Sequence, residues 1–309
     1  MSSAGQTLTS PRAAAAAQRR GARLAPGRLA LYLIAVFGSA LFLGPYIFTV
    51  GSALKAPSEL YVFPPSLWPA TPQPQNFARV FQVEKVPFGL WYLNTIIITA
   101  LAVIGTVLSA TAAAYGFARF RWWGRDFWFM VLLSTLVLPE EVVIIPKFLM
   151  FDRIPRWLFD TTLIDTWWPL FLPSWFGGGA FYVFLLRQFF LQIPRELDEA
   201  AKIDGANSFQ ILFRVLLPLS GPALATVAIF AFLGHWNDFI HPLIYLNTPE
   251  RFTLALGLRW FQQQPTDPTE PREHLLMAGS VLFTLPAILI FFSMQRIFVR
   301  GIVMSGIKG

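Results

Sequence analysis

Cysteine is absent from the 309 residues, which excludes disulfides, thiolate metal sites and cysteine nucleophiles. Charge is also scarce: Asp, Glu, Lys and Arg make up 13% of the chain, with only 17 acidic residues and 3 histidines. Hydrophobic residues instead reach 55%, and the mean hydropathy is +0.54. Because these values lie outside the usual range of soluble domains, we predict an all-α integral membrane protein.

Six apolar runs are long enough to cross roughly 30 Å of hydrocarbon as helices. They lie at about 29–54, 93–117, 126–151, 163–190, 222–246 and 277–299. The fourth run is the least regular, because Pro169, Pro173 and Gly177–Gly179 interrupt it. We expect one transmembrane domain at 29–300, preceded by a disordered basic tail at 1–28 and followed by a tail at 301–309. The first run is too long for a signal peptide, so we expect it to be retained.

The net charge of +7 is typical of a membrane protein with basic cytoplasmic segments, and we do not attribute it to nucleic-acid binding. With the N-terminus inside, most of the 24 Lys and Arg residues fall in cytoplasmic segments. We therefore expect both termini, and the segment between the fourth and fifth runs, to be cytoplasmic.

That cytoplasmic segment, 194–218, is unusually acidic for this chain. Pro194 and the acids after it favour a helix start, and Gly205 favours a helix end. Asn207 or Ser208 is then expected to cap a second helix that Pro218 interrupts. Helices that lie on membranes usually present basic residues, so acids at this surface indicate a protein partner. The four acids are Glu196, Asp198, Glu199 and Asp204.

The same segment carries a recognisable motif. Glu199-Ala200-Ala201, Gly205 and Val215-x-Leu217-Pro218 resemble the EAA signature of ATP-binding-cassette importer permeases, with Val215 where isoleucine is commoner. The longer stretches EAAKIDGA, LPLSGPAL and WNDFIHPLIYL are similar to the carbohydrate-uptake (MalG-like) branch of binding-protein-dependent transport system inner membrane components. The N-terminal tail and the loop after Tyr245 lack a clear counterpart.

The resemblance implies a permease subunit that forms a heterodimer with a second permease subunit in a bacterial or archaeal cell (inner) membrane. It would work with two cytosolic ATPase subunits and an extracytoplasmic solute-binding protein to import a sugar or related carbohydrate. No nucleic-acid partner is expected. The EAA loop between the fourth and fifth spans would be a coupling helix that docks on an ATPase subunit. The coupling residues implied are Glu199, Ala200, Ala201, Asp204, Gly205, Ala206 and Pro218.

The chain is not expected to be an enzyme or to hold a cofactor of its own. The phosphate-binding motif G-x-x-x-x-G-K-[ST] does not occur in the sequence. ATP and Mg are therefore expected to be bound by the partner ATPase subunits.

Polar residues inside the apolar runs are candidates for the substrate pathway. At 1.5 Å per residue, Glu140 lies roughly 21 Å along the third run. The polar cluster at 235–238 lies roughly 20–24 Å along the fifth run. Such groups at one level could stack on a sugar and bind its hydroxyls. They could equally satisfy backbone broken near the prolines, and the resemblance adds that the partner permease can make most substrate contacts. The candidates are Glu140, Trp236, Asn237 and Asp238.

Two other interpretations use the same region. His235, Asp238 and His241 are spaced by threes, as for a metal site or an intramembrane metal enzyme. Glu140, Glu141 and Asp238 could form the proton relay of an ion-coupled secondary transporter. Neither interpretation explains the EAA spacing.

Three further features remain. Gly105, Ser109 and Ala113 recur every fourth residue and predict a helix-packing face. The external loop 247–277 is rich in proline and glutamine, as in a flexible linker. The resemblance implies instead that it meets the solute-binding protein, and that the ending Gly306–Gly309 lies near the ATPase dimer.

Overall fold

The computed structural model describes residues 26–264 and 271–306, and every regular element in this part of the chain is a helix. The predicted basic tail 1–28 lies almost wholly outside the described residues. So do residues 265–270 of the predicted external loop and residues 307–309 of the C-terminal tail.

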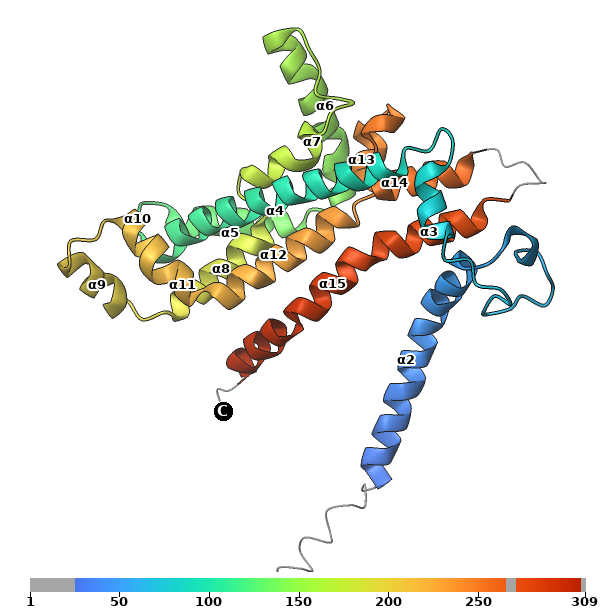
Figure 1. Cartoon of the computed structure of the whole chain (residues 1–309). Coiled ribbons are helices and arrows are strands. Elements are labelled where there is room, and N and C mark those ends of the chain that lie inside the picture. The colour runs from blue at the N-terminus through green and yellow to red at the C-terminus, as the bar shows by residue number, and fades with distance from the viewer. Residues whose placement is uncertain (1–25, 265–270, 307–309) are drawn as a thin grey trace, which may run out of the picture.

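The longer helices run in chain order along the molecule (Figure 1). They are α2 (Pro26–Ala53), α4 (Phe88–Arg119), α5 (Arg125–Ser134), α6 (Glu140–Phe159), α8 (Ala180–Gln192), α9 (Glu196–Ile203), α12 (Gly221–Trp236), α14 (Leu254–Gln263) and α15 (Glu273–Gly306). The shorter helical segments are η2 (Pro57–Glu59), α3 (Asn76–Arg79), η3 (Val80–Gln82), η4 (Thr135–Val137), α7 (Trp168–Phe171), η5 (Leu172–Trp175), α10 (Ser208–Ile211), η6 (Leu212–Leu216), α11 (Leu217–Leu219), α13 (Ile240–Tyr245) and η7 (Pro249–Arg251).

Four described stretches are long and apolar enough to cross a membrane, and they correspond to the first, second, fourth and sixth predicted runs. They are Ala30–Ala53, Phe88–Arg119, Trp168–Gln192 and Glu273–Gln295. Two bent helix pairs raise the number to six if each pair counts as one span.

The third predicted run, 126–151, is not one straight helix. The chain bends by 105° between Arg125–Val137 and Glu140–Phe159. Pro139 explains the break, because the residue before a proline is driven out of the helical conformation, and Leu138 is extended with φ −75° and ψ 119°.

The fifth predicted run, 222–246, is also divided. Its helix α12 ends at Trp236, and α13 begins only at Ile240. In a continuous helix the ring of Pro242 would clash with the carbonyl group of Asp238, so the chain leaves the helical path between them. At its other end α12 meets Ser208–Leu219 at an angle of 83°.

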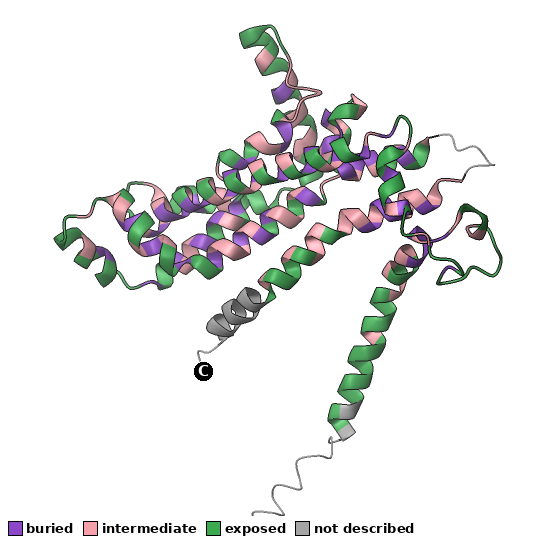
Figure 2. Cartoon of the chain, viewed as in Figure 1, coloured by how far each residue is buried: buried purple, intermediate pink, exposed green. Residues whose placement is uncertain are grey.

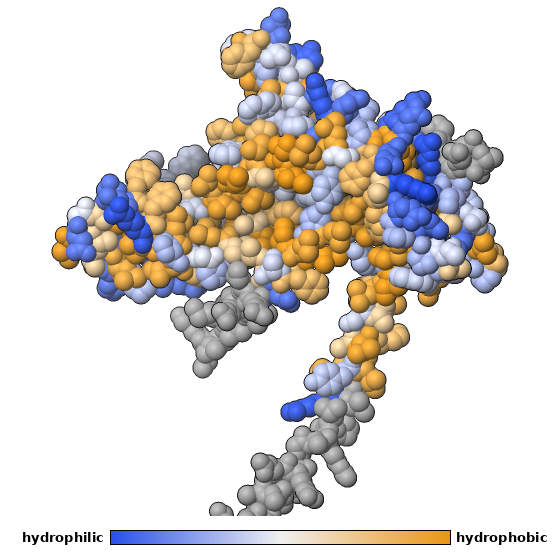
Figure 3. Space-filling view, viewed as in Figure 1, coloured by the Kyte–Doolittle hydropathy of each residue, from blue (hydrophilic) through white to orange (hydrophobic). Residues whose placement is uncertain are grey.

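The body of the molecule is a layer of packed helices in which α4 lies against α8 and α12. One end of the body carries α9 and α10, and the opposite end carries α13, α14 and α3 (Figure 1). Hydrophobic residues cover the middle of the body, whereas hydrophilic residues gather at the two ends (Figure 3). This distribution is the one expected of a bundle that spans a membrane.

The first span, α2, extends away from the body and contacts α15. Its apolar residues are largely exposed (Figure 2). Near its C-terminal end, Ala53 and Val50 pack with Ala278 and Val281 of α15.

The predicted packing face of α4, formed by Gly105, Ser109 and Ala113, contacts other segments of the same chain. A Cβ atom on Gly105 would lie 2.5 Å from the Trp175 ring, so only glycine fits beside this indole. The Ser109 hydroxyl donates a hydrogen bond of 2.8 Å to the carbonyl oxygen of Ser174. Ala113 packs at the edge of the core that α4 shares with α8 and α12.

Candidate functional site

The predicted helix, turn and helix are present at residues 196–219. α9 has Glu196, Asp198 and Glu199 in its first turn, where the helix dipole favours negative charge. Gly205 follows with φ +81°, a conformation that costs other residues steric strain. The chain then turns back, and the amide of Ala206 donates to the carbonyl oxygen of Ala201 at 2.9 Å.

The second helix begins with a reciprocal cap. The Asn207 carbonyl Oδ1 accepts from the amide of Gln210 at 2.9 Å, and the Gln210 Oε1 atom accepts from the amide of Asn207 at 2.8 Å. The regular α-helix is interrupted before Pro218, as predicted, although the helical path does not end at the proline. A π-helical turn at Leu212–Leu216 precedes it, and the helical path continues to Leu219 before the chain bends at Ser220.

The turn presents part of its motif to solvent. Glu199, Ala200, Asp204 and Gly205 are exposed, whereas Ala201 and Ala206 pack against the core beneath. Two large apolar side chains flank the motif, Ile203 at 87% exposure and Phe209 at 76%. Exposed apolar residues beside carboxylates are typical of a surface that another protein covers.

Asp198 corrects the prediction that all four acids lie at this surface. Its carboxylate forms an ion pair of 3.1 Å with Arg119 of α4, and the two side chains are only 12% and 5% exposed. The sequence contains no local signal for this pair, because the partners are brought together by the packing of α9 against the end of α4.

A polar cavity of about 280 Å³ lies where α6, α12, α13 and the α7–η5 segment meet. Glu140 Oε1 lies 3.6 Å from Lys147 Nζ and 3.2 Å from His241 Nε2. The other ring nitrogen of His241, Nδ1, lies 2.9 Å from Asp238 Oδ2. An imidazole with hydrogen on both nitrogens can donate to both carboxylates at once.

The four residues predicted for the substrate pathway are divided by the structure. Glu140 and Asp238 line this cavity. Trp236 is 2% exposed, stacks between Phe232 and Phe283, and donates from Nε1 to the carbonyl oxygen of Phe283 at 3.0 Å. Asn237 is exposed and donates to the carbonyl oxygen of Leu233 at 2.9 Å. Successive residues at a helix end point in different directions, so adjacency in sequence did not bring these side chains together.

Other lining residues were not predicted. Lys147 follows Glu140 by seven residues, two helical turns, and this spacing could have indicated a shared face. Ser174 had no such signal, and its hydroxyl lies 3.2 Å from His235 Nε2.

The metal interpretation is not supported by this geometry. His235 faces Ser174, while His241 and Asp238 face each other. Among the described side chains, no group of three or more His, Cys, Asp or Glu residues could hold a metal ion.

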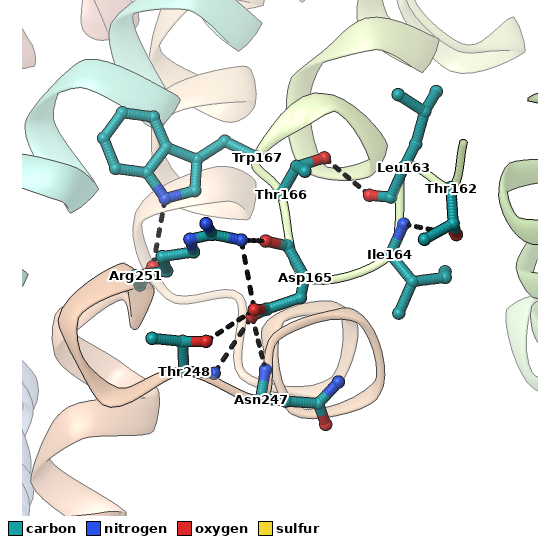
Figure 4. A network of polar contacts seen from close by, with 9 residues as sticks. All are labelled: Thr162, Leu163, Ile164, Asp165, Thr166, Trp167, Asn247, Thr248 and Arg251. Carbon is teal, nitrogen blue, oxygen red and sulfur yellow. Dashed lines mark hydrogen bonds and ion pairs between the residues drawn. The ribbon is translucent and has the colours of Figure 1, made fainter. Parts of the chain in front are cut away.

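The end of the body opposite α9 is held by Asp165, which joins the segment before α7 to the segment after α13 (Figure 4). Its carboxylate accepts from the amides of Asn247 at 2.9 Å and Thr248 at 3.0 Å, and from the Thr248 hydroxyl at 2.5 Å. Arg251 donates to the same carboxylate at 3.1 Å and also to the carbonyl oxygen of Asp165. Burial alone raises the pKa of Asp165, but these hydrogen bonds and Arg251 outweigh it, so its pKa lies below the usual aspartate value.

The described part of the predicted loop 247–277 is mostly helical and is anchored to the body, unlike a flexible linker. Leu254, Leu256 and Phe261 of α14 are buried. Gly257 lies against Trp91, where an added Cβ atom would come within 2.2 Å of the indole.

Comparisons with known proteins agree with the resemblance in the sequence. Residues 105–304 match the family described as "Binding-protein-dependent transport system inner membrane component". The probable ABC transporter permease protein YurM of Bacillus subtilis is 32% identical over 91% of this chain and 87% of that protein. The arabinooligosaccharides transport system permease protein AraQ of Halalkalibacterium halodurans is 33% identical over 78% of this chain and 81% of that protein.

A solved structure shows the same fold. It is the crystal structure of a bacterial ABC transporter involved in the import of the acidic polysaccharide alginate. The match has a TM-score of 0.75 and 25% sequence identity, and covers 87% of this chain and 95% of that chain. With helices able to span a membrane and a family match over most of its length, this chain belongs to the binding-protein-dependent transport system inner membrane components, the permease subunits of ABC importers.

Proposed function

We propose that this chain is one of two permease subunits that together form the pathway for a carbohydrate. Two separate ATPase subunits would bind ATP and Mg on the cytoplasmic side, and an extracytoplasmic solute-binding protein would deliver the substrate. Both termini and the α9 end would be cytoplasmic, in line with the basic residues of those segments. The exposed turn of Glu199, Ala200, Asp204 and Gly205, beside Ile203 and Phe209, is the observation that carries this proposal.

The chemistry of that turn suits an ATPase subunit as its partner. The alanines and Gly205 allow close approach of another backbone, and the two carboxylates can pair with cations of the partner. The two apolar side chains would supply the buried centre of the contact. Pro218 and the π turn before it would set the direction in which the second helix leaves the contact.

A co-purification experiment tests this docking. Glu199→Arg and Gly205→Asp are expected to reduce the amount of ATPase recovered with the permease by about ten-fold or more, because each places a mismatched group in the contact. Glu84→Arg changes the charge of an exposed acid elsewhere and is the matched control. Full recovery of the ATPase with both variants would refute α9 as the docking helix.

The cavity supports a carbohydrate without net charge as the substrate. Of the proteins named above, AraQ belongs to an arabinooligosaccharides transport system, and the transporter of the solved structure is involved in the import of the acidic polysaccharide alginate. In this cavity, whose lining residues are all described, Lys147 is already paired with Glu140, and His241 lies between Glu140 and Asp238 and contacts both carboxylates. An acidic sugar would therefore meet carboxylates without an available cation.

Competition for uptake tests the charge of the substrate. Neutral arabinooligosaccharides are expected to bind the transport system better than alginate oligosaccharides of the same length. Equal or better competition by the acidic sugars would contradict an uncharged substrate. The cavity is smaller than the roughly 300–1,000 Å³ of pockets for drug-sized ligands, so the second permease subunit would complete the site.

An ion-coupled secondary transporter is not favoured. Glu140, His241 and Asp238 form a hydrogen-bonded chain of the kind that proton relays use, but the matched family and the relatives named above are transport-system permeases of the ABC class. Glu141, the third acid of that relay, is exposed and does not line the cavity.

A further inference from the structure

α4 is the helix that connects the two ends of the body without a break. It has 32 residues, which corresponds to about 48 Å at 1.5 Å per residue. It packs against α7, η5, α8, α12 and α14. Two neighbouring spans are bent by 105° and 83°, and in the third, Trp168–Gln192, residues 176–179 separate η5 from α8.

At the α9 end, the last two turns of α4 are fixed to both sides of the docking turn. Arg119 pairs with Asp198 at 3.1 Å and donates from Nη2 to the carbonyl oxygen of Ile193 at 3.0 Å. The Tyr115 hydroxyl donates to the carbonyl oxygen of Ser208 at 3.0 Å. One helix end therefore holds the residue that follows α8, the first turn of α9 and the start of α10.

At the opposite end, the first turns of α4 are fixed to the segment between α13 and α14. Asn94 is 1% exposed and donates from Nδ2 to the carbonyl oxygens of Glu250 and Phe252, both at 2.9 Å. Trp91 donates from Nε1 to the carbonyl oxygen of Pro249 at 2.7 Å. The Thr95 hydroxyl accepts from the amide of Leu254 at 2.7 Å.

We propose that α4 is a rigid strut that carries movement of the α9 docking turn to segment 249–254 at the opposite face, and that Arg119, Asp198 and Asn94 are the positioning residues that hold its ends. This inference rests on the proposed function, since it assumes that an ATPase moves α9. Asp198 is thus assigned to the interior of the permease, whereas its neighbour Glu199 faces the partner.

The polar character of the contacts at both ends of α4 supports its role as a strut. Apolar side chains can slide past one another at little cost, whereas hydrogen bonds and ion pairs in a buried site are directional and specify one arrangement. Most of the acceptors are backbone carbonyl oxygens, so the contacts hold the path of each loop and not only a side chain. Closely packed interiors transmit such displacements because they deform little.

The test uses the whole importer, reconstituted in nanodiscs from this chain, the second permease subunit and the ATPase subunits. Because the chain has no cysteine of its own, Glu250→Cys introduces a unique thiol at an exposed position of segment 249–254. The probe is the rate at which this thiol reacts with a maleimide, measured without nucleotide and after trapping with ATP and orthovanadate. ATP hydrolysis and recovery of the ATPase are measured on the same samples.

In the chain that carries only Glu250→Cys, trapping with ATP and orthovanadate is expected to alter the labelling rate by about five-fold or more. This factor is the lower range of a typical coupling between sites. Arg119→Gln at one end and Asn94→Leu at the other are each expected to abolish this response while ATPase recovery and hydrolysis remain. Their controls are Arg121→Gln and Leu93→Ala, which change exposed neighbours and should keep the response.

The double variant Arg119→Met with Asp198→Leu tests whether the ion pair holds α4 in place or only stabilises the fold. It removes the ion pair without leaving a buried charge, so the protein should melt near the wild-type temperature. The labelling response should nevertheless stay lost, because the bond to Ile193 is absent. A restored response would show that the pair only supports the fold, and would overturn the proposal.

The remaining outcomes are also decisive. A response that persists in Arg119→Gln or Asn94→Leu, or that is lost only together with ATPase recovery, contradicts a strut. So does a wild-type importer that hydrolyses ATP without any change in labelling. Failure of the wild-type permease to retain an ATPase would instead overturn the proposed function on which the inference rests.

Discussion

Glu140 and His241 meet at 3.2 Å between Oε1 and Nε2, although they lie on different helices, α6 and α13, that are far apart in the sequence. Through His241 the carboxylate of Glu140 is connected to that of Asp238, and the same carboxylate also pairs with Lys147. Polar groups arranged in this way inside an apolar bundle are costly unless they serve a ligand or hold broken helices together. Substitution experiments can separate these roles.

Glu140→Gln and Asp238→Asn should lower substrate uptake by about ten-fold, because each removes a charged hydrogen-bond acceptor worth about 1.5–3 kcal/mol. Recovery of the ATPase should be unchanged, since the cavity lies away from α9. The measurement is uptake of labelled sugar together with co-purification. Glu141→Gln is the matched control, because Glu141 is adjacent in sequence and exposed. An equal loss of uptake in that control would contradict a specific role for the cavity.

Gly205→Ala should destabilise the docking turn by about 1–2 kcal/mol, the cost of a side chain in the left-handed region. No atom lies within 4 Å of the added Cβ, so the backbone conformation alone causes the effect. Gly221→Ala also adds a methyl group into open space, but at a helical position, and should be neutral or stabilising. Thermal unfolding and ATPase recovery are compared for the two variants. Identical behaviour would show that the positive φ at Gly205 is not required.

Asp165 should make the stability of the end opposite α9 depend on pH. Its pKa is lowered in the folded protein, so its stabilising effect is present above the unfolded value of roughly 3.9 and is lost as the pH falls through the folded value. Asp165→Asn keeps the side-chain shape and tolerates the φ of +59°. It should cost about 1 kcal/mol near neutral pH. In melting curves from pH 7 downward, the difference between the two proteins should shrink below about pH 4. A difference that stays constant would contradict the ionised network.

The orientation in the membrane can be measured with single cysteines. Ile203 and Phe63 are 87% and 91% exposed at opposite ends of the molecule, and no native cysteine interferes. In vesicles that contain the permease without the ATPase subunits, Ile203→Cys should react with an impermeant maleimide only when the vesicles are inside-out, and Phe63→Cys only when they are right-side-out. Reaction of both from the same side would contradict the proposed topology.

Local sequence signals predicted the α9 turn well. Acids in a first turn, a glycine at positive φ and an asparagine cap all act within a few residues, so they can be read without knowledge of the partner segments. The single helices α2, α4 and α15 were predictable for a similar reason, since length and apolar composition suffice.

Features that depend on packing between distant segments were not predictable. Asp198 and Glu199 are adjacent acids with the same local signals, yet only the approach of Arg119 makes one of them buried. Trp236 and Asp238 lie two residues apart, but the end of α12 directs one into the core and the other into the cavity. Pro139 and Pro242 indicated in the sequence where the helices break. The angles of the bends could not be predicted, because they depend on the helices packed around them.

The most direct test of the account is transport in liposomes that contain this chain, the second permease subunit and the ATPase subunits, with the solute-binding protein outside. Uptake of the sugar should require ATP on the ATPase side, should be insensitive to collapse of the proton gradient, and should be lost in Gly205→Asp. Uptake by the permease without ATP, driven by a proton or sodium gradient, would contradict the central claim.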